Sequence, residues 1–349
     1  MVERVQDADI LNKLDVDSLG ASKLNIPAMV LDLAIKAGIL EDLLRTNRLE
    51  QRRVPEIGYL AQHAFLRTFI DPNYSAEGID NIRNAKEEAI KTDKRLIYSL
   101  RHDGDVDHLI WRYVFDHEGL RAEADRTVFV AGVNMLKRPG IRIFMRAEHV
   151  IYIATPADVI RSRILFREGD IIGLDNEDRE LMEWAYGIFN ATNKAAEPKF
   201  EGAIKRGETV AAYGEAGRPY DGLMKQISRY IAEAYFPKDE SALIVSMRMY
   251  GGREFNPPNK IFRFWKAIPG FKQHIGLKAA PAYPSIEVWD WRESQSQNPG
   301  DMIAAYLAAV DSEHVRVSDL LRYQKIMERR HPGSSNIWLP EGLEDLWPI

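Results

Sequence analysis

The sequence predicts a mainly α fold with two helical lobes, a small β-hairpin or sheet element at about residues 127–154, and terminal arms. Up to about Gly119, apolar residues recur mostly at the i, i+3, i+4 spacing of amphipathic helices. Only TVFVAGVNMLKRPGIRIFMRAEHVIYIAT, residues 127–155, alternates β-branched and aromatic residues as strands do. The expected domains are an N-terminal arm at 1–26, lobes at 27–168 and 169–332, and a C-terminal arm at 333–349.

In the first lobe, three segments are expected to form helices, at residues 27–49, 55–70 and 75–92. Pro27 and Pro55 suit the first helical position, and Ser75 suits an N-cap. The strand region at 127–155 follows, with Arg138-Pro139-Gly140 as the turn between its two runs. A helix is expected to begin at Thr155-Pro156 and continue through Arg167.

In the second lobe, helical periodicity marks residues 179–192, 219–236, 301–310 and 317–330. The segment ALIVSMRMY, residues 242–250, fits a strand or a buried helix equally well, because a short apolar run has no diagnostic period. No internal repeat is evident.

The composition excludes several classes of protein. The 349 residues include no cysteine, so disulfides, thiolate zinc sites, iron–sulfur clusters and cysteine nucleophiles are ruled out. No apolar run reaches the ~18 residues of a membrane span. The first 20 residues contain four aspartates and no apolar core of a signal peptide, so we expect an intracellular protein.

Charge is distributed unevenly along this acidic chain, whose formal net charge is −5. Residues 137–167 hold seven Lys and Arg against two acids, and residues 168–183 hold seven acids against one Arg. A second basic segment at 248–278 holds seven Lys and Arg against one Glu. The reversal near residue 168 suggests the boundary between the lobes.

Both basic segments interleave cations with aromatic residues, a pattern typical of single-stranded nucleic-acid binding. In the expected strand IRIFMR, Arg142, Phe144 and Arg146 share one face. In an expected helix at 259–268, Ile261, Phe264, Trp265 and Ile268 form the apolar stripe, which leaves the neighbouring cations exposed and Phe262 free to stack on a base. The predicted RNA-binding residues are Lys137, Arg138, Arg142, Phe144, Arg146, Arg163, Arg167, Lys260, Phe262, Arg263 and Lys266. Alternatively, these charges form solvated faces, or the basic segment 137–167 pairs with the acidic one that follows it.

A cluster of acids and histidines at RHDGDVDHLIWRYVFDHEG, residues 101–119, is the best catalytic candidate. It does not fit a calcium loop, because His108 and Val114 stand where glycine and a bidentate glutamate are needed. His102 with Asp103 resembles the pair of HD-type phosphohydrolases, so a metal-dependent hydrolase using His102, Asp103 and Asp107 is one alternative function. The simpler interpretation is that Asp105 or Asp107 caps the following helix.

The ends of the chain are candidate assembly arms. The tail SSNIWLPEGLEDLWPI is too short to bury its own apolar residues, which favours docking on a neighbouring protomer. The predicted oligomerisation residues are Trp338, Leu339, Leu343, Leu346 and Trp347. The N-terminal arm either does the same or folds back on its own chain.

Two stretches of the sequence resemble the nucleoproteins of negative-strand RNA viruses. NPPNKIFRFWKAI is similar to an aromatic and basic run in rhabdovirus nucleoproteins, and VFVAGVNMLKRPGIRIFMRAE is similar to a paramyxovirus region that supplies RNA-groove residues. The strand region departs from the mostly helical pattern of that family. The coat proteins of flexible filamentous plant viruses are a second family that the chain resembles.

The resemblance implies RNA held between two helical lobes, with arms that link protomers into rings or helices. It assigns groove positions to Lys137, Arg138, Arg142, Arg146, Lys260, Arg263 and Lys266. It also implies a viral polymerase or phosphoprotein as a further partner, and a location in the virion and in the host cytoplasm or nucleus.

The predicted function is therefore a non-enzymatic viral nucleoprotein or coat protein that self-assembles and binds single-stranded RNA through its phosphates. It would use no cofactor, no metal and no membrane. A capsid or scaffold subunit without direct nucleic-acid contact is a further alternative.

Overall fold

The computed structural model describes about half of the chain. The described residues are 64, 74–104, 107–132, 148–153, 196–214, 224, 227, 229–252, 274–290, 298–312 and 314–330. They fall into two compact units: residues 130–132, 150–153 and 196–202 belong to one, and the others to the second, larger unit.

A mostly parallel sheet forms the centre of the larger unit. Its strands are β1 (Ser75–Glu77), β2 (Arg95–Arg101), β3 (Thr127–Gly132), β5 (Thr209–Tyr213), β6 (Ala242–Tyr250), β7 (Gly276–Ala279) and β8 (Tyr283–Pro284). The order is β1-β7-β6-β2-β5-β3, with β8 also paired to β6, and β3 continues into the smaller unit beside β4 (His149–Ile153). The four strands β6, β2, β5 and β3 run parallel, whereas β7 and β8 are antiparallel to β6.

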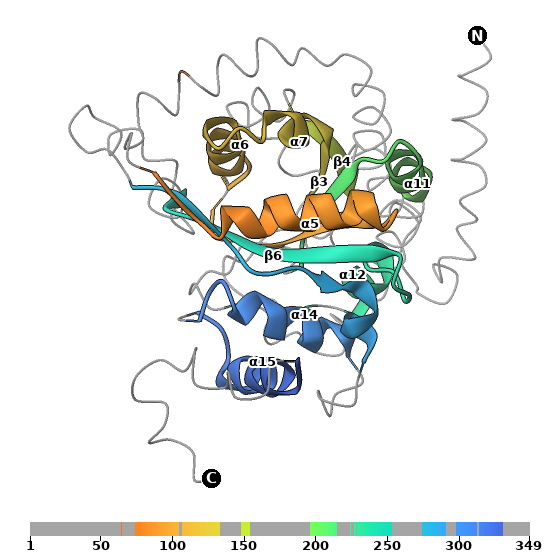
Figure 1. Ribbon diagram of the computed structural model, residues 1–349, viewed down its shortest axis with the longest axis vertical. Helices are drawn as coiled ribbons and strands as arrows, with labels where there is room; N and C mark the ends of the chain where they lie inside the picture. Colours follow the sequence, from red (N-terminus) through yellow and green to blue (C-terminus); the bar gives the residue numbers. More distant parts are fainter. Residues whose placement is uncertain are drawn as a thin grey trace, which may run out of the picture. The chain divides into compact units, whose positions relative to one another are not determined.

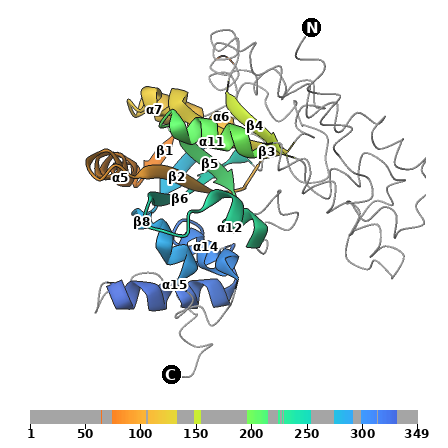
Figure 2. The ribbon, with the colours of Figure 1, turned by 90° about the vertical axis from the view of Figure 1, so that its right-hand side faces the viewer.

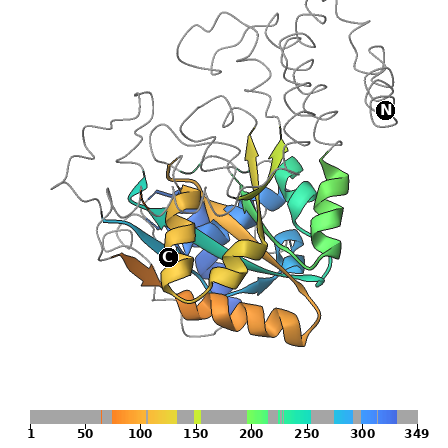
Figure 3. The ribbon, with the colours of Figure 1, turned by 90° about the horizontal axis from the view of Figure 1, so that it is seen from above.

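One face of this sheet is covered by α5 (Ile79–Lys91), α6 (Asp107–His117) and α7 (Arg121–Arg126), which lie above it in Figure 1. Figure 3 looks down on this face, with the orange and yellow helices in front of the strands. Tyr98 of β2 points to this side, where its ring meets Trp111 and Phe115 of α6. Aromatic burial of this kind stabilises the packing of α6 on the sheet.

The opposite face carries α12 (Arg229–Tyr235), α14 (Pro299–Ala308) and α15 (Val317–Arg330), as Figures 1 and 2 show. α14 is buried along its whole length and lies between the sheet and α15. Ser99 and Ser246 are paired across β2 and β6 and are fully buried on this side, so small side chains meet the alanine-rich α14. A short 3-10 helix, η4 (Ser285–Trp289), packs on α14 as well, and α11 (Glu197–Lys205) spans the two units.

The predicted mainly α fold is wrong, because the described part is an α/β fold. It has 48% of its residues in helices and 25% in strands, and the strands build one sheet with helices on both faces. The sequence interpretation missed β2, whose residues RLIYSLR lie in the part that was expected to be mostly helical. Both faces of β2 are buried, so it lacks the alternation of buried apolar and exposed polar residues that marks a half-exposed strand.

Several predicted elements are confirmed and others corrected. The helices expected at 301–310 and 317–330 correspond to α14 and α15, and residues 242–250, left open between strand and helix, form β6. The strand region contains β3 and β4, while its predicted turn at 138–140 lies outside the described residues.

The helix expected from Ser75 begins later than predicted. Ser75 lies in β1, and α5 is preceded by Gly78, whose φ of 69° is left-handed. A Cβ at Gly78 would lie 2.1 Å from the carbonyl oxygen of Ala279, so only glycine fits this turn. No described helix is long and apolar enough to cross a bilayer.

Candidate active site

The connections from β2 and β5 leave their carboxyl ends in opposite directions. After β2 the chain passes through α6 and α7 to β3, which lies beyond β5. After β5 it passes through α12, on the other face, to β6, which lies beyond β2. In open α/β sheets such a switch point opens a crevice at the carboxyl ends of the strands, and ligands bind there. Two groups of charged residues lie at this edge.

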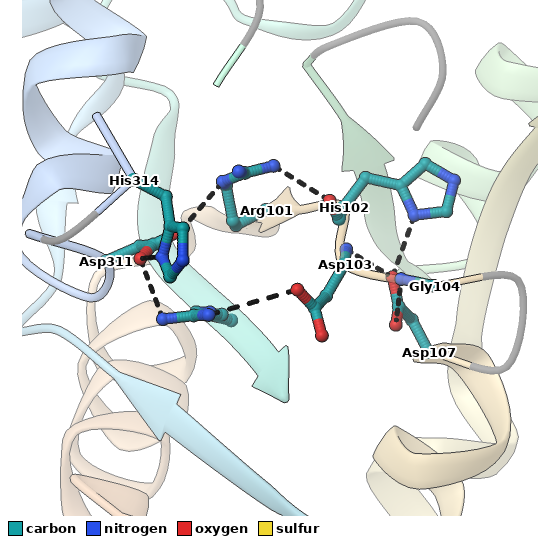
Figure 4. Close-up of polar contacts among 8 residues, drawn as sticks. Arg101, His102, Asp103, Gly104, Asp107, Asp311 and His314 are labelled. Atoms are coloured by element: carbon teal, nitrogen blue, oxygen red, sulfur yellow. Dashed lines mark hydrogen bonds and ion pairs between the residues drawn. The ribbon is translucent and has the colours of Figure 1, made fainter. Parts of the chain in front are cut away.

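The first group is a hydrogen-bonded pair of His102 and Asp107. His102 directly follows β2, and its Nδ1 lies 2.8 Å from Oδ2 of Asp107, the first residue of α6. The same carboxylate accepts the backbone N–H of Asp103 at 2.9 Å and that of Gly104 at 2.8 Å. Figure 4 shows these contacts converging on Asp107, whose side chain is 1% exposed. Asp107 therefore fixes the loop after β2 and the imidazole together, and its carboxylate does not cap α6. Asp105, the other residue predicted as a possible cap, lies outside the described residues.

These contacts assign the proton of the His102 ring. A carboxylate that already accepts two backbone N–H bonds has only acceptor sites to offer, so we assign the ring proton to Nδ1. The other ring nitrogen, Nε2, then carries a lone pair. An imidazole oriented in this way by a buried carboxylate is the arrangement that general bases use.

Asp107 is buried deeply enough to perturb its ionisation. Burial raises the pKa of Asp107 above its ordinary value of 3.8, and the hydrogen bond from His102 partly opposes this effect. The ring of Tyr213, the last residue of β5, lies 4.6 Å from that of His102. Burial and the charge of Asp107 raise the pKa of Tyr213 well above 10, so its hydroxyl stays protonated at neutral pH.

The second group joins two arginines through one carboxylate. Arg101 of β2 and Arg248 of β6 are neighbours in the parallel register. Asp311, which follows α14, accepts Arg101 Nε at 2.9 Å on Oδ2 and Arg248 Nη1 at 2.7 Å on Oδ1. His314 Nδ1 also lies 2.8 Å from Oδ1 of Asp311. Figure 4 shows Asp311 and His314 on one side of Arg101 and Asp103 and Asp107 on the other.

Asp103 connects the two groups. Its backbone N–H binds Asp107, and its Oδ1 lies 3.9 Å from Arg248 Nη2. The side chains of Asp103 and Arg248 are 14% and 17% exposed, so both are largely buried but keep some contact with solvent.

The His102 cluster was also a candidate metal site. Within the residues that the structure describes, no three or more histidines and acids are grouped to hold a metal ion. His102 Nδ1 and Asp107 instead bind one another.

The predicted RNA-binding and oligomerisation residues lie outside the described residues. This applies to Lys137, Arg138, Arg142, Phe144, Arg146, Arg163, Arg167, Lys260, Phe262, Arg263, Lys266, Trp338, Leu339, Leu343, Leu346 and Trp347. Their convergence into a groove therefore stays a prediction. Two other cations of the second basic segment are described: Arg248 binds Asp311, and Lys278 lies 3.8 Å from Glu77.

Sequence reasoning found His102, Asp103 and Asp107 but missed Arg101, Tyr213, Arg248 and Asp311. The signal for the missed residues is their position at the ends of strands, which is visible only when 95–101, 209–213 and 242–250 are recognised as adjacent parallel strands. Asp311 is 210 residues from Arg101, so no local pattern joins them.

Comparisons with known proteins do not assign the chain to a family. No protein-family model matches the sequence, and no curated protein matches it.

Proposed function

We propose that the chain is an enzyme in which His102, oriented by Asp107, transfers a proton to or from a substrate at the carboxyl edge of the sheet. The supporting observation is the 2.8 Å contact between His102 Nδ1 and the buried Asp107, at the switch point between β2 and β5. The twofold backbone anchoring of Asp107 supports a positioning role, because it fixes the ring orientation.

In the proposed reaction, His102 Nε2 accepts a proton from a water molecule as the water oxygen attacks an ester. The imidazolium that forms is balanced by the Asp107 carboxylate, and the same proton then passes to the leaving group. Asp107 does not itself take the proton. Hydrolysis of a phosphate or carboxylate ester is therefore the reaction class that this pair suits best.

The proposed role of Asp107 fixes the tautomer of the His102 ring, and ¹⁵N NMR of histidine-labelled protein can determine this tautomer. In the wild type we expect the proton of His102 on Nδ1. In the Asp107→Asn variant the amide group can donate to the ring, so we expect a shift toward the Nε2–H form. An unaltered His102 signal in that variant contradicts the assigned role of Asp107.

Catalysis can be measured on p-nitrophenyl acetate and p-nitrophenyl phosphate, with and without added divalent metal. We expect His102→Asn to lower kcat by roughly 10²- to 10⁴-fold, the usual contribution of a general base. His117→Asn is a matched control, because His117 lies at the far end of α6 and its ring binds the carbonyl of Tyr113. Equal rates in His102→Asn and the wild type, or no turnover of either ester by the wild type, contradict the proposal.

RNA coating is a second candidate, favoured by the two basic segments at 137–167 and 248–278. The described fold reduces its support from family resemblance, because two helical lobes were part of that expectation and the larger unit is built on a sheet. What remains is the charge pattern and the interleaved aromatic residues. This candidate requires no catalysis, so the ester assay separates it from the first.

A further inference from the structure

Arg248 is incompletely hydrogen-bonded for a largely buried guanidinium. Its Nη1 donates to Asp311 at 2.7 Å, but Nη2 reaches Asp103 only at 3.9 Å, beyond hydrogen-bond distance. Its Nε is buried, and no acceptor for it exists among the residues that the structure describes. A buried donor without an acceptor is costly and is rarely retained without a reason.

The neighbouring Arg101 shows what a structural arginine looks like at the same edge. Its Nε donates to Asp311 at 2.9 Å and its Nη1 to the carbonyl of His102 at 2.8 Å. Its side chain is only 2% exposed. Arg101 therefore has an acceptor for each of these two donors, whereas Nε and Nη2 of Arg248 have none within hydrogen-bond distance among the described residues.

The unused donors of Arg248 form a recognisable binding geometry. Nε–H and one Nη2–H point the same way and make the planar fork that binds phosphate or carboxylate oxygens in pairs. The fork faces the loop that begins with His102 and Asp103, because Nη2 is the atom closest to Asp103. The Asp103 carboxylate stands near this fork at a distance too long to satisfy it.

We propose that Arg248 binds the oxyanion group of the substrate through Nε and Nη2, and that this group displaces the Asp103 carboxylate. The inference rests on the proposed function and names its substrate class, an ester that carries a phosphate or carboxylate group. Asp103 can turn away without disturbing the catalytic pair, because only its backbone N–H binds Asp107. Asp103 therefore acts as an internal competitor for Arg248.

Anion binding can be measured without knowledge of the substrate. Isothermal titration of the full chain at low ionic strength uses inorganic phosphate in one arm and acetate in the other. We expect the wild type to bind one of them, and the tighter of the two identifies the oxyanion. Arg248→Met should weaken this binding at least tenfold, and Arg248→Lys should do so several-fold, because lysine keeps the charge but not the fork.

Asp103→Asn should change the anion affinity in the opposite direction to Arg248→Met, toward tighter binding, and a loss of folding cannot produce that result. Removing the competing negative charge should tighten binding several-fold. Arg83→Met is the matched control, since Arg83 of α5 is paired with Asp80 and Glu118 and not with the residues of this site, and it should bind like the wild type.

Two outcomes overturn the inference: no binding of either anion to the wild type, or wild-type affinity in both Arg248→Met and Asp103→Asn. His102→Asn should retain anion binding while losing ester hydrolysis. If the wild type binds neither anion but His102→Asn still lowers the rate of ester hydrolysis, only the role of Arg248 is rejected and the proposed function stands.

Discussion

Asp107 shows how a single residue links the local fold to the proposed chemistry. Its carboxylate receives two backbone N–H groups and the ring of His102 in an environment that is almost fully buried. Burial favours the neutral carboxyl, whereas the hydrogen bond from His102 favours the charged one. The net effect is a raised pKa, so burial outweighs the partner.

The raised pKa of Asp107 predicts a pH dependence of stability. A folded-state pKa above the ordinary 3.8 means that the folded protein holds the proton more tightly than the unfolded chain does. This contribution to stability is fully present below the unfolded pKa and is lost as the pH rises through the folded one. We expect the free energy of unfolding of the wild type, relative to Asp107→Asn, to decrease as the pH rises above about 4. Urea titrations across this range measure it, and a relative increase would show that the bond to His102 dominates.

Asp311 is the residue whose loss should cost the fold most at this edge. Without it, Arg101 keeps a buried charge with no carboxylate at Nε, because Asp311 is its acceptor there. We expect Asp311→Ala to lower the free energy of unfolding by about 3–5 kcal/mol, as is usual when one partner of a buried pair is removed. Asp80→Ala, which removes the exposed partner of Arg83, should change little. Similar urea midpoints for the two variants contradict the expected difference.

At the scale of elements, the start of α14 depends on a close approach to Ile227. Asn298 caps the helix by accepting the N–H of Gly300, and its own amide donates to the carbonyl of Ile227 at 3.1 Å. A Cβ at Gly300 would lie 2.0 Å from that same carbonyl oxygen. The backbone of α14 thus rests directly on the segment that leads into α12.

Gly300→Ala should therefore destabilise the protein, by about 1–3 kcal/mol, as other forced steric contacts in packed regions do. Helix propensity alone predicts the opposite sign, a gain of about 0.5–1 kcal/mol. Thermal unfolding separates the two effects. A melting temperature equal to or above that of the wild type would show that the approach to Ile227 relaxes at no cost.

The elements that could be predicted are those whose pattern is local. α15 has one apolar face, with Leu320, Tyr323 and Ile326 buried, and the helical period gave its range correctly. β2 could not be separated from its helical surroundings, because six of its seven residues are buried and neither of its faces is exposed to solvent. β6 stayed open between strand and helix for the same reason.

Only the part of the candidate site whose residues are close together in the sequence could be predicted. His102 and Asp107 are five residues apart, so their pairing was within reach of a sequence pattern. The contacts of Arg101 and Arg248 with Asp311 depend on strand order, on the register of β2 with β6 and on the position of α14. None of these follows from spacing along the chain.

At the scale of the whole molecule, the basic segment at 248–278 has two kinds of cation. Arg248 and Lys278, at its ends, are engaged inside the described fold with Asp311 and Glu77. The RNA-coating hypothesis therefore depends on the cations between them, together with those of 137–167. These residues lie outside the described part, so solution experiments must test the hypothesis.

RNA coating predicts that the purified protein carries nucleic acid and releases it with salt. Its absorbance ratio at 260 and 280 nm should exceed that of protein alone, and binding should weaken steeply with ionic strength because phosphate contacts release counterions. Replacing Arg142, Arg146, Arg263 and Lys266 by alanine should weaken RNA retention and flatten the salt dependence by roughly 0.7 in log–log slope for each lost contact. Four exposed cations of the described part, Lys91, Arg121, Arg206 and Arg229, form the control, because their replacement changes the net charge equally. If both quadruple variants lose RNA to the same extent, net charge and not a groove determines RNA binding. If neither variant loses RNA, the basic segments do not bind RNA, and the edge of the sheet with His102 is then the remaining candidate for ligand binding.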